Sequence, residues 1–147
     1  MMPTPQALRT RVYDVLLERG LPPTCAELGA HFGTDEVVIR RALGGLNIGK
    51  TIQMRPDGSE IWMAGPFAGQ ASAFRVIGRH AAWWANCAWD MFGVAVIAGE
   101  AVHVATHCPD CNEPVELHAD PAHAPTDDLV VHFLVPARQW FDDIGFT

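Results

Sequence analysis

The sequence predicts an α+β protein in which an N-terminal winged-helix-like unit of three helices and a hairpin precedes a helix and a small, mostly antiparallel β-sheet region. Three observations carry this prediction: capped helical periods at the start, a Pro-Asp-Gly turn between two short strand-like runs, and several β-branched runs after residue 93. The 147 residues suit about one domain, or two small units that share a core. We expect the units to span residues 1–65 and 66–147.

Three helices are expected in the first 45 residues, because apolar residues recur there every three to four positions. The predicted segments are 5–19, 24–33 and 35–45, and the last ends at a glycine pair. The second opens with a capping box, in which Thr24 and Glu27 satisfy the first free N–H groups of the helix, and Asp35 is expected to cap the third.

A hairpin is expected over residues 50–65, where KTIQMR and EIWMAG flank the turn PDGS. Three helices and a hairpin follow each other in this order in a winged helix, whose third helix enters a DNA groove. Here that helix carries Arg40 and Arg41 but also Asp35 and Glu36, and the chain has a net charge of −7. Phosphate binding needs a basic surface, so the sequence favours a scaffold over a nucleic-acid reader.

The second half is expected to contain one helix, from His80 to Phe92, which ends at Gly93 and lies among short strands. Gly99 and Glu100 would join the strands on either side of them as a hairpin. The predicted strands are 73–77, 94–98, 101–107, 114–119 and 129–135, with a connector at 66–70, a polar loop at 120–128 and a final helical turn within 137–144.

The helix at 80–92 carries the chemistry that we expect of this chain. Trp83, Cys87 and Asp90 follow at spacings of four and three, which places them on one helical face. A cysteine thiolate is a soft nucleophile, and a buried carboxyl group beside it would have a raised pKa and hold a proton. A late position in this helix would set the helix dipole against the Cys87 thiolate.

Aromatic side chains around this helix are candidates for a substrate pocket. The alternative is that they form core or interface mass, because aromatics dominate burial, and the sequence leaves both open. The candidate pocket residues are Trp83, Trp84, Trp89 and Phe74.

The CxxC pair of Cys108 and Cys111 is half of a zinc-ribbon pattern. Zinc takes four ligands, and His103, His107 and His118 lie near enough in sequence to complete a zinc or copper site. The alternative is a tight turn in which Cys108 packs as a small apolar residue.

The bulk composition predicts a cytoplasmic protein with reduced thiols. No apolar run approaches the roughly 20 residues that cross a bilayer, and the N-terminus lacks the apolar core of a signal peptide. A reducing cytosol keeps cysteines as thiols or metal ligands. Cys25, in the first turn of its helix, is expected to be buried and inert.

Two runs, GPFAGQASAFRV and WWANCAWDMFGV, together with the helical N-terminal unit, resemble the organomercurial (alkylmercury) lyase family. The resemblance covers most of the chain and implies protonolysis of a carbon–mercury bond. Cys87 and Asp90 match the family's first catalytic cysteine and its aspartate, and Cys108 matches a structural cysteine. Mercury is then part of the substrate, no cofactor is required, and small external thiols take part.

One departure from the family pattern bears on this expectation. The family's second catalytic cysteine follows the last core strand, and residues 140–147 contain none. Cys111, Asp142 or Asp143 are the candidates for its replacement, although a carboxylate is a hard ligand for soft mercury.

Two other functions stay open at this stage. One is an enzyme acting on a small organic substrate in specialised metabolism, with Cys87 as the nucleophile and Asp90 as the acid or base. The other is a non-enzymatic metal-binding or regulatory protein that uses the winged-helix unit and the CxxC. The sequence leaves the oligomeric state open.

Overall fold

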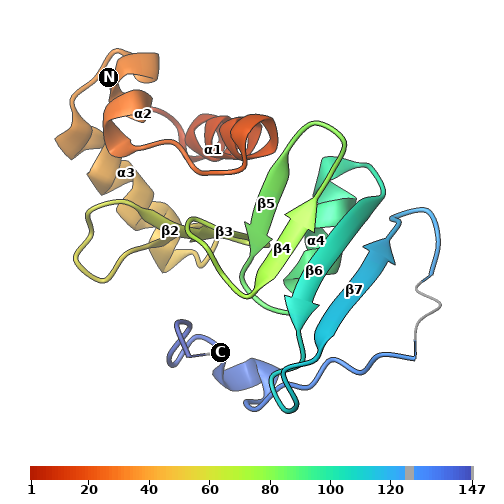
Figure 1. Cartoon of the computed structure of the whole chain (residues 1–147). Helices are drawn as coiled ribbons and strands as arrows, with labels where there is room; N and C mark the ends of the chain where they lie inside the picture. The colour runs from red at the N-terminus through yellow and green to blue at the C-terminus, as the bar shows by residue number, and fades with distance from the viewer. Residues whose placement is uncertain (125–127, 147) are drawn as a thin grey trace.

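A computed structural model describes residues 1–124 and 128–146. Three N-terminal helices pack at one end of a seven-stranded antiparallel sheet, and a fourth helix covers one face of its central strands (Figure 1). This is the α+β class that the sequence predicts. The elements are α1 (Pro5–Arg19), α2 (Cys25–Phe32), α3 (Glu36–Ile48), β1 (Gln53–Met54), β2 (Ile61–Ala64), β3 (Phe67–Ala68), β4 (Phe74–Ile77), β5 (Ala82–Ala85), α4 (Asp90–Ala98), β6 (Val102–His107), β7 (Pro114–Ala119) and the 3₁₀ helix η1 (Ala137–Gln139).

The caps that the sequence predicts start α2 and α3. The Thr24 hydroxyl accepts from the backbone N–H of Glu27, whose carboxylate accepts from the N–H of Thr24, and Asp35 caps α3. The predicted end of α3 at 44–45 is wrong by one turn. Leu46 still packs on the core, and the helix continues through the glycines to Ile48.

The predicted hairpin is confirmed, because β1 and β2 pair antiparallel around the turn at 56–59. The strand ladder then continues through β3, which the sequence analysis takes for a connector, to β5. The full order is β1-β2-β3-β5-β4-β6-β7, so one sheet crosses the expected unit boundary at 65–66.

The predicted helix at 80–92 is wrong. Residues 82–85 form β5 instead, with alternate burial that places Trp83 inside and Trp84 on the other face. The run Ala-Trp-Trp-Ala has the two-residue period of a half-buried strand. Four cross-strand partners in β4 and one in the adjacent β3 select the strand, whereas the period of the sequence alone does not.

The predicted strand at 94–98 is also wrong, because these residues belong to α4. Met91, Val94 and Ala95 have helical spacing and are buried, while Val96 and Ile97 are exposed. The expected hairpin across Gly99 therefore does not form, and β6 pairs with β4 and β7.

Of the remaining predictions for the second half, some are confirmed and one is wrong. The strands at 73–77, 101–107 and 114–119 and the final helical turn are confirmed within a residue or so as β4, β6, β7 and η1. The strand at 129–135 is wrong: this stretch has no ladder partner among the described residues, and Leu129, Val130 and Leu134 are exposed. The expected loop at 120–128 includes 125–127, which lie outside the described residues, as does residue 147.

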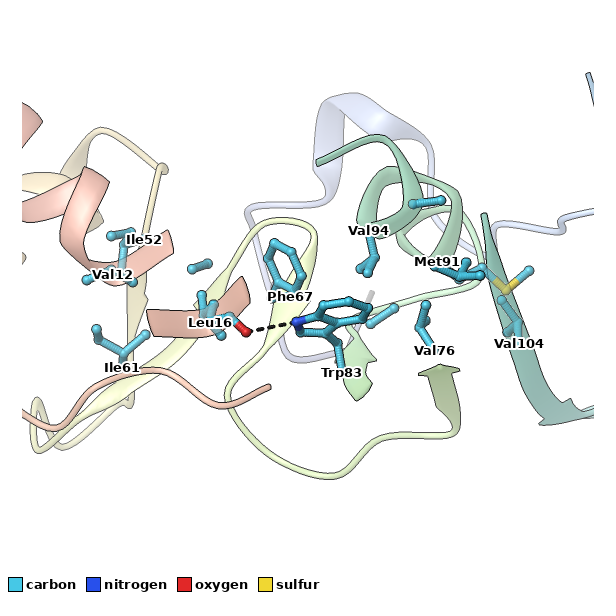
Figure 2. Packing of buried hydrophobic residues seen from close by; sticks show 14 of the residues in the cluster. Val12, Leu16, Ile52, Ile61, Phe67, Val76, Trp83, Met91, Val94 and Val104 are labelled. Carbon is cyan, nitrogen blue, oxygen red and sulfur yellow. Dashed lines mark hydrogen bonds between the residues drawn. The ribbon is translucent and has the colours of Figure 1, made fainter. Parts of the chain in front are cut away.

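A continuous hydrophobic core joins the helices to the sheet. Figure 2 shows Leu16 of α1, Phe67 of β3 and Trp83 of β5 in contact at its centre. The indole N–H of Trp83 donates to the carbonyl oxygen of Leu16 over 2.8 Å. Beside this bond, Gly20 caps α1 with φ of 84°, and a Cβ at this position would meet the Ala82 carbonyl oxygen. The end of α1 is thereby held against β5. No helix in the described part of the chain has the length and apolar character to cross a membrane.

Candidate functional site

Cys87 lies in the short connection between β5 and α4. Trp89 is the N-cap residue of α4 and Asp90 is its first residue, and their backbone N–H groups both donate to the Cys87 sulfur. The thiol therefore stands before a helix N-terminus, where the helix dipole favours the thiolate. This position corrects the sequence-based expectation of a late position in a helix.

Burial nevertheless raises the pKa of the Cys87 thiol above its ordinary value, and the charge of Asp90 raises it further. The two backbone N–H groups lower it and offset part of that effect. The free protein consequently holds Cys87 mainly as a thiol at neutral pH. A ligand that binds sulfur strongly is needed to displace this proton.

Asp90 is the second member of the site. Burial raises the pKa of its carboxyl group, while interactions with Asn86 and with the Cys87 thiol lower it in part. The side chains of Cys87 and Asp90 are hydrogen-bonded to each other. The sequence-predicted pair therefore meets in space, although a strand end and a helix start bring it together and not one helical face.

The pair borders a cavity of about 320 Å³. The rest of its wall comes from the end of α3, the β1–β2 hairpin and the C-terminal segment, and it is mostly apolar. The lining residues are Lys50, Thr51, Gln53, Met63, Gly65, Asn86, Cys87, Trp89, Asp90, Phe133, Trp140, Phe141, Ile144 and Gly145.

The C-terminal segment 133–146 supplies the aromatic side of this cavity. The rings of Phe133 and Trp140 lie 5.0 Å apart, and the Trp140 indole N–H donates to the carbonyl oxygen of Val135. The Lys50 ammonium lies 4.3 Å from the centre of the Phe141 ring, a cation–π distance. No local sequence signal predicts Phe133, Phe141 and Lys50 as site residues, because only the fold brings them to the cavity that Cys87 borders.

Helix α1 supports the part of the cavity wall that Gly65 forms. The Tyr13 hydroxyl in α1 donates to the carbonyl oxygen of Gly65 over 2.6 Å, and the Asn86 N–H donates to that of Pro66 over 3.2 Å. Burial raises the pKa of Tyr13, and the nearby Asp90 charge raises it further. Asp90 is therefore close enough to Tyr13 to influence its ionisation.

Of the four residues expected in an aromatic pocket, only Trp89, which is 61% exposed, lines the cavity. Trp83 is 2% exposed and belongs to the core, and Phe74 packs against that core. Trp84 lies on the other face of β5, where the Arg75 guanidinium stacks 4.5 Å from its ring. None of these three residues lines the cavity beside Cys87.

None of the expected replacements for the second cysteine borders the cavity. Asp142 and Asp143 line a separate depression beside η1. Cys111 is exposed in the β6–β7 turn. Cys87 is thus the only cysteine among the described lining residues.

The expected histidine-completed metal site does not form within residues 1–124 and 128–146. No group of three or more His, Cys, Asp and Glu side chains is placed there to hold a metal ion. His103 and His118 stack across β6 and β7 with ring centres 5.1 Å apart, and the Cys108–Cys111 pair stands apart from them in its turn. The four donors that zinc prefers are not gathered.

Cys25 is buried, as expected. Its thiol donates to the carbonyl oxygen of Ser59 over 3.6 Å, and the Glu60 carboxylate accepts from its backbone N–H. Burial, with the Glu60 charge second, raises the pKa of Cys25 to about 11. This thiol is protonated and inert at neutral pH.

The fold and the site together define a class of protein with one thiol and one carboxyl group at the border of an apolar cavity. A family model described as alkylmercury lyase (MerB) matches residues 67–146, which is more than half of the chain and includes this pair. The chain belongs to the alkylmercury lyase family, which confirms the resemblance found in its sequence motifs.

Solved structures support the same fold. The chain is similar to the crystal structure of the mercury-bound form of MerB2, with a TM-score of 0.54 and 17% sequence identity, over 84% of this chain and 68% of that one. At this identity the likeness shows the fold alone. A search of curated proteins finds no match.

Proposed function

We propose that this protein cleaves carbon–mercury bonds by protonolysis, with Cys87 as the mercury ligand and Asp90 as the proton donor. The observation that carries the proposal is the hydrogen-bonded thiol and carboxyl pair at the border of a mostly apolar cavity. Mercury is soft and binds sulfur strongly, and the cavity accepts the organic group. Family membership adds support for a lyase-like activity.

The first step adds Cys87 to mercury as a second sulfur ligand. The substrate is an organomercury thiolate, R–Hg–SR′, in which SR′ comes from a small external thiol. The Cys87 sulfur bonds to mercury and loses its proton to the Asp90 carboxylate, with which it already shares a hydrogen bond. The N–H groups of Trp89 and Asp90 stabilise the sulfur as this proton leaves.

The second step is proton transfer to carbon. Asp90, now protonated, delivers its proton to the carbon bound to mercury, and the electron pair of the carbon–mercury bond becomes the new carbon–hydrogen bond. The hydrocarbon RH leaves, and Hg(II) stays bound to the Cys87 thiolate and SR′. Burial favours this step, because the raised pKa of Asp90 retains the proton until the carbon is in place.

The external thiol supplies the second sulfur in this scheme. No other cysteine sulfur lines the described cavity wall, and two thiolates on mercury increase the electron density at the leaving carbon. The cavity therefore has to admit SR′ beside Cys87.

A second candidate function rests on the same single thiol. One nucleophilic sulfur beside a carboxyl group, with Lys50 among the residues that line the same cavity, also suits an enzyme that acts on a small organic electrophile. In that case Cys87 forms a covalent adduct and Asp90 moves the proton. An adduct on Cys87 that forms from an activated ester and accumulates in Asp90→Asn, detected by mass spectrometry, is the expected result for this candidate.

The test of the lyase proposal is release of benzene from phenylmercury in excess small thiol, measured in the headspace by gas chromatography. We expect the wild type to exceed the thiol-only control and Cys87→Ser to fall to that control. Asp90→Asn should lose roughly 10²- to 10⁴-fold, the usual contribution of a general acid. Asp142→Asn is the matched control, because this carboxylate lies outside the cavity, and it should retain full turnover.

Two outcomes would contradict the proposal. If the wild type releases no more benzene than the thiol-only control, the protein has no lyase activity on this substrate. If Cys87→Ser retains full turnover, the protein has the activity, but Cys87 is not its mercury ligand. Circular dichroism of each variant shows whether a loss reflects chemistry or unfolding.

A further inference from the structure

The Cys108-Pro109-Asp110-Cys111 turn between β6 and β7 carries a second pair of thiols that the lyase chemistry does not use. Both cysteines are free, Cys111 is exposed and Cys108 is half-buried. The Cys111 side chain and the backbone N–H groups of Asp110 and Cys111 all hydrogen-bond to the Cys108 sulfur. The two cysteine side chains therefore interact within one turn, and the turn provides donors for a thiolate.

Backbone hydrogen bonds hold this turn in shape. The Cys108 N–H donates to the Glu113 carbonyl oxygen and the Asn112 N–H donates to the Cys108 carbonyl oxygen, both over 2.9 Å. Asn112 closes the turn in the left-handed region with φ of 58°, a conformation that asparagine tolerates. Since β6 and β7 pair over six residues up to His107 and Pro114, the thiols stand on a fixed base.

The donor set selects the type of ligand. Two adjacent thiolates without a third protein donor do not satisfy zinc, which takes four ligands. They suit a soft cation that is content with two sulfur ligands. Hg(II), the product of the proposed reaction, is such a cation.

The sheet topology places this turn at the same end of the sheet as Cys87. β4 pairs antiparallel with both β5 and β6, so β5 and β6 run in the same direction. Arg75 faces Trp84 on one side and Ala105 on the other, and Cys87 and Cys108 each follow three residues later. Only β4 lies between β5 and β6, so the ends of these two strands, from which the chain continues to Cys87 and to Cys108, lie roughly 10 Å apart.

We propose that Cys108 and Cys111 form a dithiol site for Hg(II), placed to receive the ion after cleavage. Cys108 and Cys111 displace Cys87 and SR′ from the metal by thiol exchange. Two S–Hg bonds form and two break, Cys87 and SR′ each take up one of the protons that the new ligands release, and no oxidant or reductant is needed. The transfer rests on the proposed function, whereas the binding of Hg(II) does not.

Hg(II) alone tests the binding. Reduced Cys87→Ser protein, which lacks the cavity thiol, is loaded with one equivalent of Hg(II), passed through a desalting column in excess monothiol and analysed for mercury. We expect it to retain about one Hg(II) per chain and to hide both turn thiols from a thiol-counting reagent. Adding Cys108→Ser or Cys111→Ser should each lower the retained mercury at least tenfold, because either change destroys the chelate.

Cys25→Ala in the Cys87→Ser background is the control, since this buried thiol takes no part, and it should leave retention unchanged. Equal retention with one turn thiol or with two would overturn the proposal, and so would loss of all mercury from Cys87→Ser protein. The substitutions lie in an exposed turn, and circular dichroism verifies the fold.

The failure of each proposal is distinguishable. If phenylmercury releases no benzene but the Cys87→Ser protein retains Hg(II) through Cys108 and Cys111, the lyase proposal fails and the dithiol site stands. If benzene is released but mercury retention does not depend on Cys108 and Cys111, the dithiol site fails and the lyase proposal stands.

Discussion

Replacement of Trp83 by phenylalanine tests whether the indole joins the helical unit to the sheet. Trp83 is 2% exposed and its N–H donates to the Leu16 carbonyl oxygen over 2.8 Å. That oxygen also accepts from the Gly20 N–H over 2.9 Å, so the substitution leaves it with one partner. The lost bond should therefore cost its net value of about 1 kcal/mol and not the full penalty of an orphaned group.

The smaller ring adds a packing term. Phenylalanine leaves a gap between α1 and β5, and lost core contacts of this size cost about 1–2 kcal/mol. We expect Trp83→Phe to lower the free energy of unfolding by about 2–3 kcal/mol in total. The melting temperature should fall by roughly 5–10 °C, at about 2–4 °C per kcal/mol for a chain near this size.

Urea unfolding followed by far-ultraviolet circular dichroism measures this difference without relying on tryptophan emission. Trp84→Phe is the matched control on the next residue of β5. Its ring is half-buried against Arg75, and its loss should cost less than about 1 kcal/mol. If the two variants lose the same stability, the Trp83–Leu16 junction does not join α1 to the sheet in the way we describe.

Two further predictions concern ionisation. Asp90→Asn should lower the pKa of Cys87, because the Asp90 charge is the second cause of its raised value, while burial, the first cause, remains. The pH dependence of alkylation by iodoacetamide measures this pKa. An unchanged pH profile would show that Asp90 does not influence the ionisation of Cys87. Glu27→Gln should cost about 0.5–1 kcal/mol at pH 7 by weakening the capping box and the Arg19 ion pair. Hydrogen bonds, first from Arg19, lower the pKa of Glu27 from 4.5 to about 2. The contribution of Glu27 to stability is therefore present above the unfolded value of 4.5 and should be lost as the pH falls toward about 2. A difference in the free energy of unfolding between wild type and Glu27→Gln that persists at pH 2 would contradict this assignment.

Local signals in the sequence predict the helical half of the fold well. Thr24 with Glu27, and Asp35, mark helix starts through contacts made within three residues, so the sequence contains all the information that these caps need. The same holds for the Pro-Asp-Gly turn, where Gly58 adopts φ of 70°. Such elements depend little on the rest of the chain.

The second half is less predictable because its elements depend on distant partners. Val94 to Ala98 are β-branched or small, and this composition suits a strand as well as a buried helix. Only the packing of Val94 and Ala95 against the sheet selects the helix. Likewise, residues 129–135 have the composition of a strand but gain no ladder, and Phe133 instead joins the cavity wall.

The site shows the same division. Cys87 and Asp90 are close in sequence, and any compact local structure keeps them near each other, so the pair is predictable even from a wrong helix. Lys50 and Phe141 are 91 residues apart in the chain, by the difference of their numbers, and their contact depends on the complete fold. The aromatic wall could not be predicted without it.

The two raised pKa values at the site argue for a pair that conserves a proton until substrate binds. In an exposed site Cys87 would lose its proton to water more easily, and Asp90 would be a weaker proton acceptor. Burial opposes both ionisations, so the thiol and the carboxyl group together keep a proton that water does not remove. In the proposed reaction, a soft metal bound to carbon overcomes this barrier, because its bond to sulfur compensates for the lost thiol proton. That proton then passes to Asp90 and from Asp90 to the carbon. The burial that makes Cys87 a poor general nucleophile thus favours a substrate that binds sulfur before it reacts.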